Sequence, residues 1–196
     1  MRTNSTKTRT IVGLGLLTAI VVVLQLLGSF IHIGPFNISF VLMPIVVGAA
    51  LFGVWAGAWL GFVFGLVVLF TDPTVPFFMA HSVVLTIILV LLKGVLAGIL
   101  SGLVYKLLGK KHSKAAVFVA AAICPIVNTG IFLLGCKLLF SPVIEQLASL
   151  NNVSVGKFIG TIILLFNFLP ELIVNIVLCP AIIQIIKYGE KSIAKK

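Results

Sequence analysis

Acidic residues are scarce in this chain, which has only four Asp and Glu among its 196 residues. Four carboxylates are too few for a two-metal catalytic site, and the sequence shows no paired-carboxylate site. The sequence also contains no H-E-x-x-H, no G-x-S-x-G and no Walker glycine loop. We therefore expect that this chain is not an enzyme and hydrolyses no ATP itself.

Cysteine is rarer still, with three residues, and its positions do not indicate a metal site. Cys124, Cys136 and Cys179 all lie inside apolar segments, without C-x-x-C spacing and without histidines beside them. Such cysteines behave as small hydrophobic side chains. We expect no bound metal and no cofactor.

Charged residues of both signs make up only 9% of the chain, whereas 61% of it is hydrophobic. One soluble core cannot bury that much apolar surface, so the composition predicts an all-α integral membrane protein with a single domain over residues 1–196. The net charge of +10 does not indicate a nucleic-acid partner. The basic residues stand in short clusters between apolar runs, where they set the orientation in the membrane.

The apolar runs predict a bundle of six transmembrane helices. The long runs, at about 1.5 Å per residue, are sufficient to cross a hydrocarbon core of about 30 Å. Pro44 favours a kink in the short second helix. The predicted helices cover residues 11–31, 38–52, 54–70, 83–108, 115–140 and 158–188.

The distribution of Lys and Arg predicts the orientation of this bundle. Eleven of the fourteen fall in the N-terminal segment, after the fourth helix or in the C-terminal tail, all on one side of a six-helix arrangement. The positive-inside rule then places both termini in the cytoplasm of a multi-pass cell-membrane protein. The uncharged segment 28–37 and the proline-rich segment 71–82 become the outward loops.

Glycines recur at every fourth residue in two of the predicted helices. The first row is Gly53, Gly57, Gly61 and Gly65, and the second is Gly94, Gly98 and Gly102. Residues four apart lie on one face of a helix, and small residues there let two backbones approach closely in lipid. We expect the two helices to be packed neighbours or sliding surfaces.

Lys93 and Glu171 lie inside apolar runs, where each charge costs at least about 2.5 kcal/mol of insertion free energy. Counted along their helices, Lys93, Asn128 and Asn167 all reach the middle of the membrane. Two interpretations remain open. Lys93 forms an ion pair with Glu171 that locks two helices together, or Lys93, Asn128 and Asn167 line a polar pocket that opens outward. Both can hold, because an anionic ligand can compete for Lys93.

Asn37 and His81 lie in the two outward loops above this pocket. The candidate substrate-binding residues are therefore Lys93, Asn128, Asn167, Glu171, Asn37 and His81. For His81 a position at the membrane interface is the alternative, and we favour it over a role as a metal ligand. No helix carries a repeated polar face, so a channel is disfavoured.

Several stretches resemble the substrate-binding S components of energy-coupling factor (ECF) vitamin transporters. The resemblance covers the whole chain. Family members usually carry Ala-xxx-Ala on the first helix, where this chain has Gly15 and Ala19. The other stretches are P-F-N-I-S-F entering the second helix and P-I-V-V-G-A-A-L-F-G-V-W-A-G-A-W-L-G in the second and third helices.

This resemblance implies a fold of six helices and a vitamin site near the outer side, built by the last three helices and capped by the two outward loops. It further implies that a transmembrane coupling subunit and two ATP-binding subunits supply the energy, with docking at Gly15 and Ala19. Such proteins belong to the prokaryotic plasma membrane.

Within that family, C-P-I-V-N-T-G-I-F around Asn128, together with Lys93, is most similar to the pantothenate-type members. A hydroxylated vitamin that bears a carboxylate suits one lysine and two asparagines. Riboflavin or another vitamin is the alternative, and riboflavin needs more aromatic stacking surface. A solitary small-solute permease is the rival function.

Overall fold

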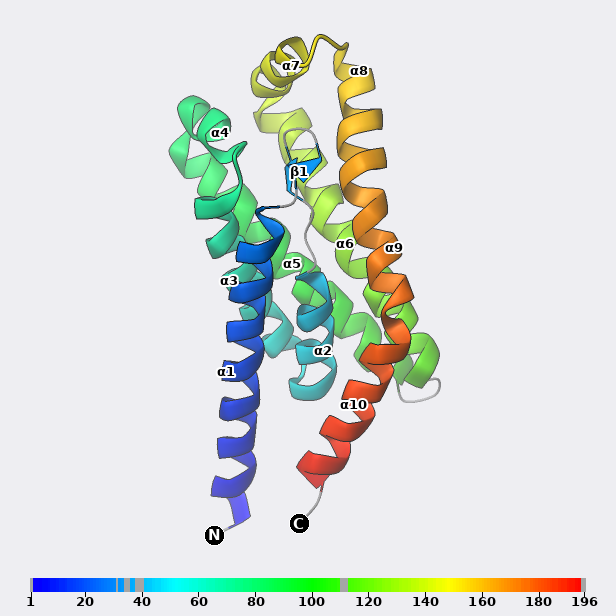
Figure 1. The fold of residues 1–196 in the computed structure, drawn as a ribbon. Coiled ribbons are helices and arrows are strands. Elements are labelled where there is room, and N and C mark those ends of the chain that lie inside the picture. Colours follow the sequence, from blue (N-terminus) through cyan, green and yellow to red (C-terminus); the bar gives the residue numbers. More distant parts are fainter. Residues whose placement is uncertain (1, 31, 34–35, 38–40, 110–112, 195–196) are drawn as a thin grey trace.

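The computed structural model describes residues 2–30, 32–33, 36–37, 41–109 and 113–194, with side chains described in 7–30, 41–109 and 114–189. Four long helices form most of the bundle, and a shorter apolar helix packs among them (Figure 1). The long helices are α1 (Arg2–Gly28), α3 (Val54–Thr71), α5 (Val83–Gly109) and α6 (Ser113–Leu139), and the shorter one is α2 (Leu42–Phe52).

The last apolar segment is helical but not uniform. It comprises α8 (Val155–Lys157), the π-helix η1 (Phe158–Phe168), α9 (Leu169–Val177) and α10 (Cys179–Ala194). The predicted helix 158–188 is thus interrupted at Leu178, between α9 and α10. Pro180 explains this break, because proline lacks an N–H and its ring clashes with the carbonyl four residues earlier.

Two outward loops of the prediction contain regular structure. Segment 28–37 holds two antiparallel strands of two residues, β1 (His32–Ile33) and β2 (Phe36–Asn37). Segment 71–82 holds the short helix α4 (Val75–His81), and α7 (Ser141–Leu150) follows α6. In Figure 1, α4 and α7 lie at the end of the bundle opposite the start of α1 and the end of α10.

Within the described ranges, five helical segments are long and apolar enough to cross a membrane. They are Lys7–Gly28, Val54–Thr71, Val83–Gly109, Lys114–Leu139 and Val155–Val177. At 11 residues, α2 is too short to cross a bilayer core unaided. The all-helical membrane fold is therefore confirmed apart from the strand pair, whereas the count of six spans and the cytoplasmic position of the termini stay predictions.

The two glycine rows pack against each other along α3 and α5. A methyl group added at Gly57 would lie 2.6 Å from the carbonyl oxygen of Gly98, and one at Gly61 would overlap the carbonyl of Gly94. Bulk at Gly65 would lie 2.8 Å from the carbonyl oxygen of Val90. The prediction that these helices are neighbours is confirmed, and glycine is what permits their close approach.

Candidate functional site

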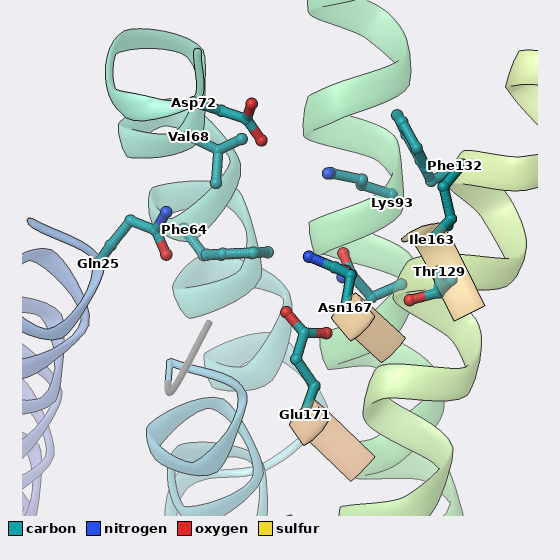
Figure 2. A pocket seen from close by; sticks show the side chains of 11 residues that line it. Gln25, Phe64, Val68, Asp72, Lys93, Thr129, Phe132, Ile163, Asn167 and Glu171 are labelled. Carbon is teal, nitrogen blue, oxygen red and sulfur yellow. The ribbon is translucent and has the colours of Figure 1, made fainter. Parts of the chain in front are cut away.

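A cavity opens among α1, α3, α5, α6, η1 and α9 (Figure 2). Four residues of the predicted site face it, each from a different element: Lys93, Asn128, Asn167 and Glu171. The other lining residues are Gln25, Phe64, Val68, Asp72, Thr129, Phe132 and Ile163. The structure thus gathers these four polar residues at one cavity, although α5, α6 and the consecutive η1 and α9 lie in three separate parts of the sequence.

Lys93 lies midway along α5 and is half-buried. Its ammonium stands 4.8 Å from the centre of the Phe132 ring, which comes from α6. Such cation–π contacts contribute from about 0.5 to 2 kcal/mol, depending on desolvation. The Phe132 ring therefore helps to hold this positive charge at the cavity wall, where an anionic group can reach it.

The side-chain oxygen of Asn128 is a hydrogen-bond acceptor that receives no donor from the described residues. Its side chain is only 6% exposed, and its Oδ1 atom accepts no hydrogen bond from any described part of the chain. A buried polar atom in this condition costs about 1 to 3 kcal/mol. A guest that places an N–H or O–H against Asn128 removes that penalty.

The two carboxylates of the cavity are held differently. Asp72 follows α3, and its Oδ1 accepts hydrogen bonds from the backbone N–H of Thr74 (2.8 Å) and from the Thr74 hydroxyl (2.7 Å). Asp72 therefore stabilises the turn into α4. Glu171 is 2% exposed in the first turn of α9, and its backbone carbonyl accepts a hydrogen bond from Asn175 Nδ2 at 2.8 Å.

Gln25 is one of three polar lining residues, with Asp72 and Thr129, that the predicted site does not include. It is the only amide in the apolar run of α1 and is buried, and its Nε2 donates to Thr71 Oγ1 at 3.4 Å. This hydrogen bond ties α1 to the end of α3 beside the cavity. The signal available in the sequence is a lone amide within the apolar stretch V-V-V-L-Q-L-L.

The cavity is small in this structure, with a volume of about 40 Å³. Pockets for drug-sized ligands span roughly 300 to 1,000 Å³, so a guest larger than a few waters requires the walls to move apart. One wall is η1, which is wound as a π-helix over eleven residues. Long π-helical stretches are rare, and π-helical turns occur frequently at functional sites.

The family of the chain follows from its match to a known protein family. Residues 9–183 match the family of the ECF transporter, substrate-specific component. The chain belongs to this family. No curated protein and no solved structure matches it. As an S component it is a transport subunit rather than an enzyme, and its family associates with the other subunits of ECF transporters.

In this S component, His81 does not line the cavity with the four polar residues, and the predicted site residue Asn37 has its side chain outside the described residues. His81 is exposed at the end of α4, where its ring lies 5.6 Å from the Phe140 ring, and it is not among the residues that line the cavity. Asn37 pairs with His32 in the strand ladder, while its side chain lies outside the described residues. The substrate-binding role of either residue stays a prediction.

Gly15 and Ala19, the expected docking residues, are exposed on α1 of the S component. A methyl group added at Gly15 would meet nothing within 4 Å. Gly13, two residues earlier, differs because bulk there would meet the Phe52 ring at 2.5 Å. The Gly15 position is therefore open to a partner, whereas Gly13 serves packing within the chain.

Proposed function

We propose that this S component binds a water-soluble vitamin in the cavity between α1, α3, α5, α6, η1 and α9, and that the vitamin is pantothenate. The observation that supports the proposal is that one cavity has both a cation and an unsatisfied hydrogen-bond acceptor in its wall. Lys93 supplies the positive charge, and Asn128 Oδ1 lacks a donor among the described residues.

Pantothenate has groups that complement both. Its carboxylate suits the Lys93 ammonium, since a charge-assisted hydrogen bond is roughly twice as strong as a neutral one. A hydroxyl or the amide N–H of the vitamin can donate to Asn128 Oδ1. The geminal methyl groups of the molecule suit the walls that Phe64, Val68 and Ile163 provide.

Charge balance at the cavity also favours an anionic group close to Lys93 over one placed elsewhere. Asp72 and Glu171 both line the cavity, and a carboxylate near either of them is repelled. The Asp72 carboxylate accepts hydrogen bonds from Thr74. Lys93 is the cation in the described cavity wall that can bind an anionic guest. The guest should therefore bind with its carboxylate between α5 and α6.

Riboflavin is the second candidate, because two aromatic rings face the cavity. Phe64 comes from α3 and Phe132 from α6, so a flat ring system has stacking surface on both. Riboflavin itself carries no carboxylate for Lys93. Competition between the two vitamins for one site distinguishes these candidates.

Transport by this S component requires partners that dock on its first helix. We assign the contact to Gly15 and Ala19, whose exposure leaves the α1 backbone accessible. The partners are one transmembrane coupling subunit and two ATP-binding subunits. This arrangement has both termini in the cytoplasm and the protein in the prokaryotic plasma membrane.

A binding screen and an uptake assay together test this function. The purified chain is titrated with water-soluble vitamins, and the same preparation is placed in liposomes to measure uptake. We expect saturable binding of one vitamin and no uptake without ATP and partner subunits. Uptake of solute by the isolated chain would show a solitary permease and refute the proposal.

A further inference from the structure

A second hollow shares no residue with the binding cavity. It lies among elements at the end of the bundle where Figure 1 shows α4 and α7. It has a volume of about 340 Å³ and lies among the end of α6, the start of α7 and the α8–η1 segment. We refer to it as the α6–α7 groove. Its lining residues are Leu133, Cys136, Lys137, Ser141, Ile144, Glu145, Val155 and Ile159.

The groove has apolar walls and two opposite charges. Lys137 belongs to the last turn of α6 and Glu145 to α7, and both side chains are exposed. Among the described residues, neither the Lys137 ammonium nor the Glu145 carboxylate forms an ion pair. The Ser141 hydroxyl between them in sequence donates to the Lys137 carbonyl at 2.9 Å. One ammonium and one carboxylate therefore flank the same apolar surface and can each accept an outside partner.

The depth of Lys137 in the membrane can be inferred from the apolar span of α6. Its apolar span, Lys114–Leu139, ends two residues beyond Lys137. Lys137 thus stands where the hydrocarbon core gives way to the headgroups, and exposed Leu134, one turn earlier on the same helix, lies toward the apolar region. A molecule in the groove has its polar part at headgroup level and its apolar part along Leu133 and Ile159.

We propose that the α6–α7 groove is a binding site for one zwitterionic phospholipid whose headgroup ends in a primary ammonium. The lipid phosphate pairs with Lys137, the headgroup ammonium pairs with Glu145, and an acyl chain covers the apolar wall. Charge complementarity selects this class. A phosphatidylglycerol headgroup carries only negative charge, which Glu145 repels, and a choline headgroup has no N–H to donate to the carboxylate.

Native mass spectrometry of the whole chain in mixed bilayer discs tests the site. The discs contain equal amounts of phosphatidylethanolamine, phosphatidylcholine and phosphatidylglycerol, and the measured quantity is the ratio of lipids that stay bound. We expect phosphatidylethanolamine to be enriched about two- to fivefold, the range of solvent-exposed ion pairs. This wild-type comparison needs no variant, so equal retention of the three lipids already overturns the proposal.

Single substitutions then locate the enrichment. Glu145→Gln and Lys137→Gln should each abolish the preference, because each removes one of the two charges. Lys157→Gln is the matched control, since Lys157 is exposed on α8 at the same end of the bundle but does not line the groove. Enrichment of phosphatidylglycerol, or a preference that survives both groove substitutions, would contradict this assignment.

Discussion

Gly57 and Gly98 face each other so closely that neither position has room for a side chain. Their backbones meet where α3 crosses α5, with bulk at Gly98 overlapping the carbonyl of Gly57. We predict that Gly57→Ala or Gly98→Ala lowers the free energy of unfolding by about 1 to 3 kcal/mol, the usual cost of overpacking. The midpoint of thermal unfolding in detergent measures this loss.

Gly15→Ala is the control for that prediction, because the added methyl meets open space. Alanine favours a helix over glycine by roughly 1 kcal/mol, so this variant should unfold at the same temperature or higher. Equal midpoints for Gly15→Ala, Gly57→Ala and Gly98→Ala would mean that the glycine rows are not in tight contact.

If the partner subunits dock on α1, a bulky residue at Gly15 or Ala19 should disturb assembly rather than the stability of the chain. Gly15→Leu or Ala19→Leu should abolish co-purification with the coupling subunit while vitamin binding stays unchanged, because the leucine holds two backbones apart. Gly160→Leu is a matched control, since Gly160 is also exposed with open space around it, on η1. Normal assembly of both α1 variants would remove α1 from the interface.

Lys93 and Glu171 face one cavity, and the relation between them is testable by a double-mutant cycle (Figure 2). If Lys93 serves the ligand, the stability losses of Lys93→Ala and Glu171→Ala should add, within about 0.5 kcal/mol. Thermal unfolding of the two single variants and the double variant provides the measurement. Recovered stability and normal binding in the double variant would instead assign Lys93 to an ion pair, and would favour an uncharged vitamin such as riboflavin.

Much of the candidate site could be predicted from the positions of its residues along the predicted helices. The depths of Lys93, Asn128 and Asn167 in the membrane follow from the sequence because each residue of a helix advances by a fixed rise. The free-energy cost of a charge inside the bilayer indicates that Glu171 needs a partner. The packing of α3 on α5 was equally predictable, since the spacing of four residues places each glycine row on one face. These are properties of single helices.

What sequence reasoning missed depends on long-range structure. Gln25 lines the cavity only because α1 packs beside α3, and no periodicity in either helix reveals that neighbour. The π-helical winding of η1 follows no residue preference that the sequence displays. Residues Val75–His81 of the second outward loop form α4, which brings the His81 ring to 5.6 Å from the ring of Phe140, a residue far along the chain. The role of His81 in substrate binding stays a prediction.

Asn128→Ala should weaken vitamin binding by about 1 to 3 kcal/mol, the range for a buried neutral hydrogen bond. The fold should be preserved, because Asn128 Oδ1 accepts no hydrogen bond from the described residues that the substitution would break. Asn151→Ala controls for the loss of an amide, since Asn151 lies at the end of α7 and away from the cavity. Calorimetric titration of each variant compares their dissociation constants, and equal affinity for wild type and Asn128→Ala would remove Asn128 from the site.

The most direct measurement is calorimetric titration of the purified chain with pantothenate, before and after Lys93→Ala. The Lys93 ammonium beside Phe132 should hold the carboxylate of the vitamin, so removing it should weaken binding by about 2 to 5 kcal/mol, as for a broken desolvated charge pair. Saturable binding to wild type that falls by this amount in a folded Lys93→Ala variant is the predicted result. Absence of pantothenate binding to wild type, or unchanged affinity in the variant, would contradict the assignment of this cavity.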